Sequence, residues 1–290
     1  MYFPEVIYIE TTNKCNAECI MCPHKTMKRE KITMSDEVFA SALRRCKELK
    51  PNRVQIFMHK EGEPLLDGKI TERISAVKTE LGEGNEIAMN TNAMLLSEET
   101  AEKIIASGLD TIYFSVDGFD RESYSRIRIG LDYDTVAGNI RRFFWLKDKL
   151  QSNIRVIMQT LIQSESDSSA DKFRQVWEKY PCEFYIKRMH GYLDGGHSSQ
   201  TRKLSRTQLN ACTDPFRILV IYSDGNTGLC CWDYDNEYCT GSIAGESLLE
   251  IFNGERASKL RQAITSCNGH TVNPCNRCAR IFGDDTISLF

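Results

Sequence analysis

The sequence predicts an α/β fold in which a mostly parallel sheet is built from alternating strands and helices. Short apolar runs recur along the first two thirds of the chain, amphipathic stretches separate them, and polar turns follow their ends. The expected strands are residues 6–10, 53–58, 86–90, 111–116, 154–160 and 183–187. Strands that alternate with helices pair in parallel through right-handed crossovers, so their carboxyl ends share one edge of the sheet.

Helix signals separate these strands. Ser35 is expected to cap a helix over 36–49, and Ser97 a helix that ends at Gly108, which supplies a left-handed stop. The first of these helices carries one apolar face: Val38, Phe39, Ala42, Leu43 and Cys46. Cys46 is therefore expected to pack as a small core residue. Further helices are expected over 133–150 and around 173–177.

Bulk properties exclude several classes of function. The chain has 290 residues, 12 cysteines and a formal charge of −3. Such a charge gives no basic surface for nucleic acid, and no apolar run approaches the roughly 20 residues that span a bilayer. No signal peptide is evident at residues 1–5. In a chain of this size the cysteines indicate metal ligation in a reducing compartment, so a cytoplasmic location is expected.

Three cysteines follow the first expected strand at C-x3-C-x2-C spacing: Cys15, Cys19 and Cys22. Soft thiolate ligands in this number suit an iron–sulfur cluster. Because a [4Fe–4S] cube contains four irons, three cysteines leave one iron open to a ligand that is not protein. The alternatives are buried cysteines or a zinc site, although structural zinc takes four protein ligands.

This spacing resembles the motif of the radical S-adenosylmethionine (radical SAM) superfamily. The resemblance implies that SAM chelates the open iron through its amino and carboxylate groups. An electron from the cluster then splits the sulfonium C–S bond and gives a 5′-deoxyadenosyl radical. The resemblance also implies a partial (β/α)6 TIM-like barrel with its chemistry at the carboxyl ends of the strands.

A turn after the second expected strand resembles a second family motif. Family members commonly carry Gly-Gly-Glu-Pro there, and its backbone and glutamate bind the methionine amino group of SAM. Gly62, Glu63 and Pro64 match this motif, whereas Glu61 stands where the first glycine usually lies. A Gly-Glu-Pro turn is common in proteins, so its position after this strand carries the assignment.

Three further residues are candidates for binding the cofactor. Asn92 follows the third expected strand, and Ser115 ends the fourth, where the family often places a serine against the ribose or carboxylate of SAM. Arg128 lies in a segment that resembles one whose arginine can face the family's active site. A solvated basic stretch is the alternative for Arg128.

A second set of four cysteines lies near the carboxyl end of the chain: Cys212, Cys230, Cys275 and Cys278. A β-hairpin is expected between the first two, with strands over 216–222 and 227–230 and a turn at Asp224-Gly225. A helix over 247–264 is expected before the C-x2-C pair. Four cysteines that include a tight pair are also a common structural zinc site.

The order of these features is similar to the twitch domain, a shortened form of the SPASM domain that binds one auxiliary [4Fe–4S] cluster. The spacing resembles that of 2-deoxy-scyllo-inosamine dehydrogenase and neomycin C epimerase type enzymes. The resemblance therefore implies two [4Fe–4S] clusters. It also implies two domains, a radical SAM barrel over 1–200 and a twitch domain over 201–290.

The outcome of the reaction depends on a residue that resolves a substrate radical. Cys239 is the first candidate, as a hydrogen-atom donor, because an S–H bond is weaker than the C–H bond that forms. Cys231 adjoins a ligand and is expected to point away in a strand, and Cys267 lies in a polar loop. The connection over 189–206 carries His190, Asp194 and His197, which are weaker candidates for substrate contact.

The expected function is hydrogen abstraction from a carbinol C–H of an aminosugar, aminoglycoside or aminocyclitol-like small molecule, leading to epimerisation. Oxidation by a radical SAM dehydrogenase and epimerisation of a peptide are the alternatives, and a non-catalytic metal protein is the alternative of another class. A reducing partner such as flavodoxin or ferredoxin is expected to supply the electron.

Overall fold

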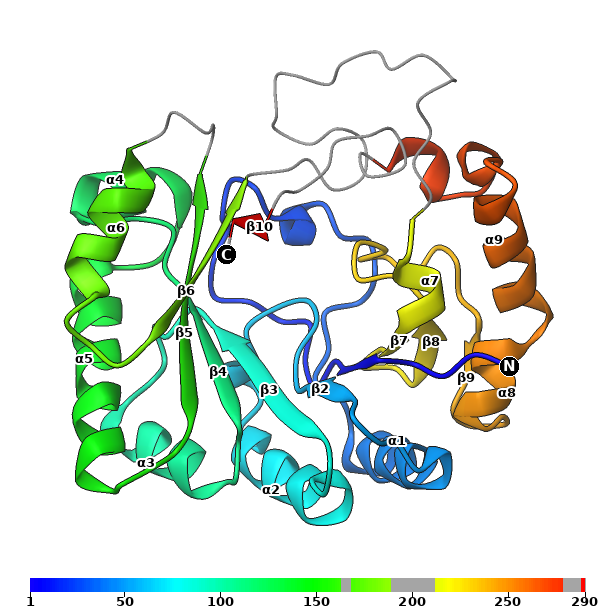
Figure 1. Ribbon diagram of the computed structural model, residues 1–290, viewed down its shortest axis with the longest axis horizontal. Coiled ribbons are helices and arrows are strands. Elements are labelled where there is room, and N and C mark those ends of the chain that lie inside the picture. Colours follow the sequence, from blue (N-terminus) through cyan, green and yellow to red (C-terminus); the bar gives the residue numbers. More distant parts are fainter. Residues whose placement is uncertain (163–167, 189–211, 279–287, 290) are drawn as a thin grey trace.

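The computed structural model describes residues 1–162, 168–188, 212–278 and 288–289 (Figure 1). Its strands form one sheet in the order β10-β6-β5-β4-β3-β2-β1-β7-β8-β9. Their bounds are β1 Val6–Ile9, β2 Gln55–Phe57, β3 Glu86–Thr91, β4 Thr111–Ser115, β5 Arg155–Ile162, β6 Glu183–Arg188, β7 Ile218–Ile221, β8 Asn226–Gly228, β9 Gly241–Ser242 and β10 Ser288–Leu289. Neighbouring strands from β1 to β6 are parallel, as the sequence predicts.

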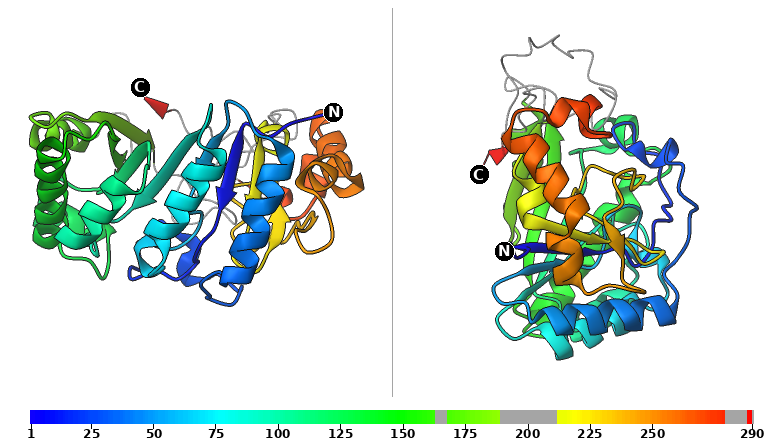
Figure 2. Two further views of the ribbon diagram at one scale, coloured as in Figure 1. Left: turned by 90° about the horizontal axis from the view of Figure 1, so that it is seen from below. Right: turned by 90° about the vertical axis from the view of Figure 1, so that its right-hand side faces the viewer.

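Helices α1 to α6 connect these strands and lie along the outer side of the curved sheet (Figures 1 and 2). Their bounds are α1 Asp36–Leu49, α2 Ile70–Leu81, α3 Glu98–Ala106, α4 Arg121–Ile127, α5 Tyr133–Lys149 and α6 Ser169–Trp177. The side chains of Ser35 and Ser97 cap α1 and α3, and Gly108 takes a left-handed φ of 83°, as expected. Within the described residues the sheet remains open, so the architecture is a partial barrel.

The carboxyl-terminal part continues the same sheet. β7 pairs in parallel with β1, and β8 and β9 follow as antiparallel strands. The helices of this part lie at the end of the sheet away from α5 and α6 (Figure 2). They are α7 Asp214–Arg217, α8 Leu248–Asn253 and α9 Glu255–Thr265. The boundary expected at residue 200 falls outside the described residues.

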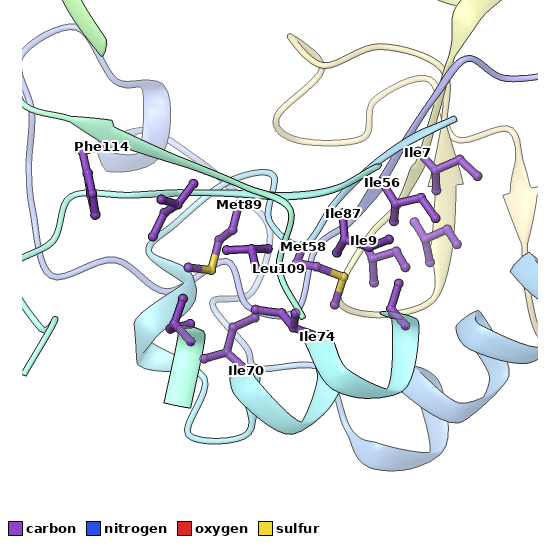
Figure 3. Close-up of a cluster of buried hydrophobic side chains, with 14 of the residues drawn as sticks. Ile7, Ile9, Ile56, Met58, Ile70, Ile74, Ile87, Met89, Leu109 and Phe114 are labelled. Carbon is purple, nitrogen blue, oxygen red and sulfur yellow. The ribbon is translucent and has the colours of Figure 1, made fainter. Parts of the chain in front are cut away.

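The strands divide their side chains between a helix-covered face and an inner face. Ile7 pairs in register with Ile56, and Ile56 with Ile87, all fully buried toward the helices. Figure 3 shows Ile70 and Ile74 of α2 pointing toward these strand side chains. On the other face, Tyr8 stacks on Phe57 with ring centroids 5.0 Å apart. This alternation leaves the inner face and the carboxyl edge for functional groups.

The structure corrects four expectations. Phe216 and Arg217 lie in α7 rather than in the hairpin strand, because Asp214 and Pro215 start a helix there. The helix expected over 247–264 is interrupted at Gly254, whose extended backbone ends α8 and begins α9. No helix is expected from the sequence over α2 or over α4, and the structure has both. Cys231 lies in a turn after β8, not in a strand.

All 12 cysteines lie within the described residues, and each is free of a disulfide. Cys46 is fully buried in α1, as expected. The helices among the described residues include none with the length and apolarity needed to cross a bilayer.

Candidate active site

The first cysteine loop leaves the carboxyl end of β1 and is closed at its base by Asn13. The buried Asn13 side chain donates to the carbonyl of Glu30 at 2.9 Å and accepts from the backbone of Ile32 at 2.7 Å. Within the loop, the Cys22 N–H donates to the Cys19 carbonyl at 3.0 Å. The spacing of the cysteines thus belongs to a compact loop with its own backbone bonds.

The three thiols of this loop influence one another electrostatically. Burial raises the pKa of Cys15 to about 11, and the charges of Glu63 and Cys19 add to it. Burial likewise raises the pKa of Cys22 to about 12, with further contributions from Glu61, Cys19 and Cys15. A metal that binds these sulfurs must therefore displace protons from them.

Glu63 organises the turn after β2. Its carboxylate accepts hydrogen bonds from the backbone of Leu65 at 3.1 Å, the Thr91 hydroxyl at 2.7 Å and the backbone of Asn92 at 2.7 Å. Burial raises the pKa of Glu63, against the effect of these donors. Since a carboxylate offers about four acceptor positions, most of its capacity is used inside the protein.

Gly62 brings this turn against the cysteine loop. Its φ is +80°, and a Cβ at this position would lie 2.4 Å from the carbonyl oxygen of Lys14. The Glu63 N–H donates to that same carbonyl at 2.8 Å. Pro64 begins the 3₁₀ helix η2 (Pro64–Leu66) directly after this contact. Glycine is required here both for its left-handed φ and for the close backbone approach.

Asn92 joins the end of β3 to the same loop. Its side-chain amide donates to the side-chain oxygen of Asn16 at 2.7 Å, and its own oxygen accepts from the backbone of Met94 at 3.0 Å. Asn16 lies between the first two cysteines, a connection that the sequence analysis missed. The sequence shows that Asn92 follows a strand, but it does not show that Asn16 is its partner.

Ser115 and Arg128 lie at the next positions along this edge. The Ser115 hydroxyl accepts from the side-chain amide of Gln159 at 3.4 Å. Arg128 forms an ion pair with Asp117 at 2.5 Å and donates toward the Cys19 sulfur at 3.6 Å. The Arg128 side chain therefore contacts the first cysteine loop and does not lie in an exposed basic stretch.

The four cysteines of the second set also lie near one another. Burial raises the pKa of Cys230, with contributions that include the charges of Cys212 and Cys278. Burial raises the pKa of Cys275 to about 12, with contributions from Cys278 and Cys212. Residues far apart in the sequence thus come close enough for their charges to influence one another.

Two of the remaining thiols, those of Cys239 and Cys231, lie in different places. The Cys239 sulfur lies 3.4 Å from the Gly241 carbonyl, beside the edge strand β9, and among the described residues no hydrogen bond joins its side chain to either cysteine set. The Cys231 sulfur donates toward Asp214 at 3.5 Å, and Cys231 packs against the buried cluster of Ile218, Val220 and Tyr222. His190, Asp194 and His197 lie outside the described residues.

A buried ionic junction that the sequence analysis missed joins the two parts of the site. Arg29 follows the first cysteine set and binds the Glu10 carboxylate through two hydrogen bonds, at 2.8 and 2.7 Å. Its Nε donates to the Tyr234 carbonyl at 2.8 Å, and Glu10 also accepts from the backbone and hydroxyl of Ser223, both at 3.0 Å. The position of Glu10, an acidic residue at the end of an apolar strand, was the sequence signal that could have indicated this junction.

Lys60 and Glu61 extend the junction. Their side chains pair at 2.9 Å while almost fully buried, and Lys60 also donates to the Asp233 carbonyl at 3.3 Å. Burial works to lower the pKa of Lys60, but the carboxylates of Glu61 and Glu10 together outweigh it and the pKa is raised. Glu61, at the position of the family's first glycine, thus has a structural partner in this chain.

Two family models match this chain, one over the part with the first cysteine set and the other over the part with the second set. The model of the radical SAM superfamily matches residues 9–160, which run from the last residue of β1 through the first cysteine loop and strands β2 to β4 into β5. The chain belongs to the radical SAM superfamily. A model described as an iron–sulfur cluster-binding domain, SPASM, matches residues 212–279.

Curated relatives match part of the chain. A probable GTP 3',8-cyclase of Methanococcus maripaludis is 31% identical over 137 residues, 46% of this chain and 43% of that protein. A tungsten-containing aldehyde ferredoxin oxidoreductase cofactor-modifying protein of Pyrococcus furiosus is 28% identical over 111 residues, 38% of this chain and 30% of that protein. The chain spans less than half the length of each of these relatives.

Solved structures share the fold over most of the chain. BtrN in complex with AdoMet and 2-DOIA aligns with a TM-score of 0.63 and 16% identity, over 98% of this chain and 99% of that one. Native anSMEcpe with bound AdoMet gives a TM-score of 0.69 and 16% identity, over 90% and 84%. Streptococcus suis SuiB bound to precursor peptide SuiA gives 0.71 and 14%, over 90% and 67%.

The residues present fit the cofactors that the family implies. Three thiols of one loop and four thiols of the carboxyl-terminal part offer the soft donors that iron–sulfur clusters require. No three His, Cys, Asp or Glu side chains in the described ranges gather tightly enough for a single metal ion. The two cysteine sets and the turn at Gly62 define the candidate active site.

Proposed function

We propose that this radical SAM protein abstracts a hydrogen atom from a carbinol C–H of an aminosugar, aminoglycoside or aminocyclitol-like molecule. The observation that supports it most is the convergence of Cys15, Cys19 and Cys22 with the ends of β2, β3 and β4 at one edge of the sheet. Bound together, a [4Fe–4S] cluster and SAM supply the 5′-deoxyadenosyl radical.

The chain's residues have distinct roles in this proposal. Cys15, Cys19 and Cys22 ligate the first cluster, and Cys212, Cys230, Cys275 and Cys278 ligate an auxiliary one. Gly62, Glu63 and Pro64 form the turn that receives the methionine amino group, and Glu63 keeps Asn92 and Thr91 in place beside it. Ser115 and Arg128 complete the edge of the cofactor site.

We propose epimerisation as the outcome, because thiols lie within the carboxyl-terminal part that carries the second cysteine set. Cys239 remains the proposed donor: its S–H bond breaks as the substrate C–H bond forms. An electron and a proton delivered through an external donor such as flavodoxin or ferredoxin then restore the thiol. The cysteines form no disulfide among the described residues, which supports a reducing compartment, and we infer the cytoplasm.

Oxidation to a ketone is the second candidate, because the second cysteine set would provide an electron acceptor next to the substrate. BtrN, which shares the fold over nearly the whole chain, was solved with AdoMet and 2-DOIA, and this similarity of fold favours neither outcome over the other. Peptide epimerisation is a further alternative, and the fold shared with SuiB supports a peptide as the substrate.

Metal analysis tests the cluster assignment. Anaerobically reconstituted protein is expected to hold about eight irons and eight sulfides, and a Cys275→Ala/Cys278→Ala variant about four. The loss of four irons in the variant would assign them to the second set. About four irons with one zinc in the wild-type protein would contradict the auxiliary cluster.

Solvent deuterium tests the outcome once a substrate has been found by screening aminosugars and aminocyclitols. An epimerase incorporates deuterium from the exchanged thiol at one carbon, whereas a dehydrogenase yields a ketone without it. Cys239→Ala should remove the epimer while 5′-deoxyadenosine still forms. Cys231→Ala is the matched variant, and loss of the epimer in that variant alone would reassign the donor.

A further inference from the structure

The segment after α4 is paired with the first cysteine loop. The Glu18 N–H donates to the Ile129 carbonyl at 2.9 Å, and the Ile20 N–H donates to the Ile127 carbonyl at 3.0 Å. These two bonds flank Cys19 on one side and Arg128 on the other. Cys19 and Arg128 therefore face each other across a short backbone pairing, and their contact follows from the register.

The Arg128 side chain is held in this place from two directions. One terminal nitrogen lies 3.6 Å from the Cys19 sulfur, and the other lies 2.5 Å from the Asp117 carboxylate. The Arg128 side chain is 11% exposed and that of Asp117 is 0% exposed. A guanidinium so buried and so anchored cannot turn to solvent without breaking an ion pair.

The backbone beneath this pair is built for close contact. Asp117, two residues beyond the end of β4, has a left-handed φ of 49°. A Cβ at Gly118 would lie 2.7 Å from the backbone of Tyr124 in α4. The Arg128 N–H donates to the Tyr124 carbonyl at 2.8 Å, which fixes the end of the same helix. The turn and the helix together set where Arg128 lies.

We propose that Arg128, anchored by Asp117, raises the reduction potential of the iron–sulfur cluster that Cys19 ligates. This inference rests on the proposed function, since it requires the first cluster. Reduction adds negative charge to the cluster, and a nearby cation with an N–H directed at a ligand sulfur stabilises that charge. Burial strengthens the effect, because little water screens the charges. Arg128 is thus a positioning residue with an electrostatic role.

An EPR-monitored redox titration of the reconstituted full-length protein tests the proposal. The signal of the first cluster is assigned by its absence in Cys19→Ala. In Arg128→Gln the ratio of reduced to oxidised cluster at a fixed potential should fall at least tenfold, which is about 59 mV for a one-electron couple. Arg126→Gln, which changes an exposed arginine in the last turn of α4, should leave the ratio unchanged.

Arg128→Lys separates charge from geometry and guards against poor folding of the glutamine variant. Lysine keeps the positive charge, but its single ammonium group lacks the planar guanidinium whose two terminal nitrogens contact Asp117 and Cys19 at the same time. Its potential should lie between those of the wild type and Arg128→Gln, and iron content confirms loading. If Arg128→Gln and Arg128→Lys both have the same reduction potential as Arg126→Gln, the inference about Arg128 is wrong, while the proposed function stands. A wild-type protein without the signal would overturn the proposed function as well.

Discussion

His59 lies on the inner face of the sheet, where its ring packs edge-on against Phe57 at 5.4 Å. Its Nδ1 accepts the Asn90 N–H at 3.2 Å, so the ring binds the next strand in its neutral form. Burial lowers the pKa of His59 to about 3, and the positive charges of Lys187 and Lys60 act in the same direction. Its unfolded-state pKa is about 6.5.

This difference predicts a pH-dependent loss of stability. Below pH 6.5 the unfolded chain binds a proton at His59 that the folded chain does not, so stability is full above that pH and falls toward pH 3. Between pH 7 and pH 5 the wild type should lose about 2 kcal/mol more unfolding free energy than His59→Gln. Urea unfolding at the two pH values measures it, and equal losses in both proteins would contradict the assignment.

At the scale of single residues, the sequence identifies positions better than partners. Asn92 and Ser115 could be selected because a polar residue follows each apolar strand. Asn16 and Asp117 were not selected, because their contacts depend on how separate loops dock. For Cys239 the sequence predicts a role as hydrogen-atom donor but no partner, and in the structure its sulfur contacts the Gly241 carbonyl at the sheet edge.

At the scale of elements, the turn between β2 and η2 fixes the distance between two loops. Gly62 is the contact point, since its missing side chain lets the Lys14 carbonyl approach. A larger side chain at Gly62 would therefore displace the backbone of the first cysteine loop, and no helix or strand lies at the point of contact.

Gly62→Ala should destabilise the protein by roughly 2–5 kcal/mol, because the added methyl both clashes and occupies a left-handed φ. It should also lower iron loading of the first cysteine set. Gly138→Ala is the control: it lies in α5 with open space around its Cβ position, and the change should stabilise by up to about 1 kcal/mol. Thermal unfolding and iron content measure both, and normal iron loading in Gly62→Ala would refute the role.

Local signals explain which elements could be predicted. α1 and α3 carry serine caps, whereas α2 begins at Lys69 without a side-chain cap, although Ile70, Ile74, Val77 and Leu81 repeat at helical spacing. The six parallel strands followed from their alternation with helices. The pairing of β7 with β1 could not be predicted, since it joins residues more than 200 positions apart.

At the scale of the whole molecule, the Glu10–Arg29 junction unites the two halves. Glu10 is fully buried at the end of β1, and it receives Arg29 from the first loop and Ser223 from the carboxyl-terminal part. The backbone N–H groups of Lys28 and Arg29 donate in turn to Asp235, at 2.7 and 3.2 Å. Both cysteine-bearing parts are thereby anchored to one carboxylate and one guanidinium.

Arg29→Gln should cost about 3–5 kcal/mol in unfolding free energy, because Glu10 would remain buried without its cation. The matched control is Arg121→Gln, which removes an exposed pair with Asp134 and should cost far less, because solvent screens that pair. Chemical denaturation of both variants measures the difference. Similar costs for the two arginines would show that the junction contributes no more than a surface pair.

Cleavage of SAM tests the central claim most directly. Reconstituted protein, reduced with dithionite and mixed with SAM, should produce 5′-deoxyadenosine and methionine. Alanine at Cys15, Cys19 or Cys22 should abolish this product, while Cys267→Ala, at an exposed thiol outside both sets, should retain it. Wild-type protein that carries a full complement of iron yet forms no 5′-deoxyadenosine would contradict radical SAM activity in this chain.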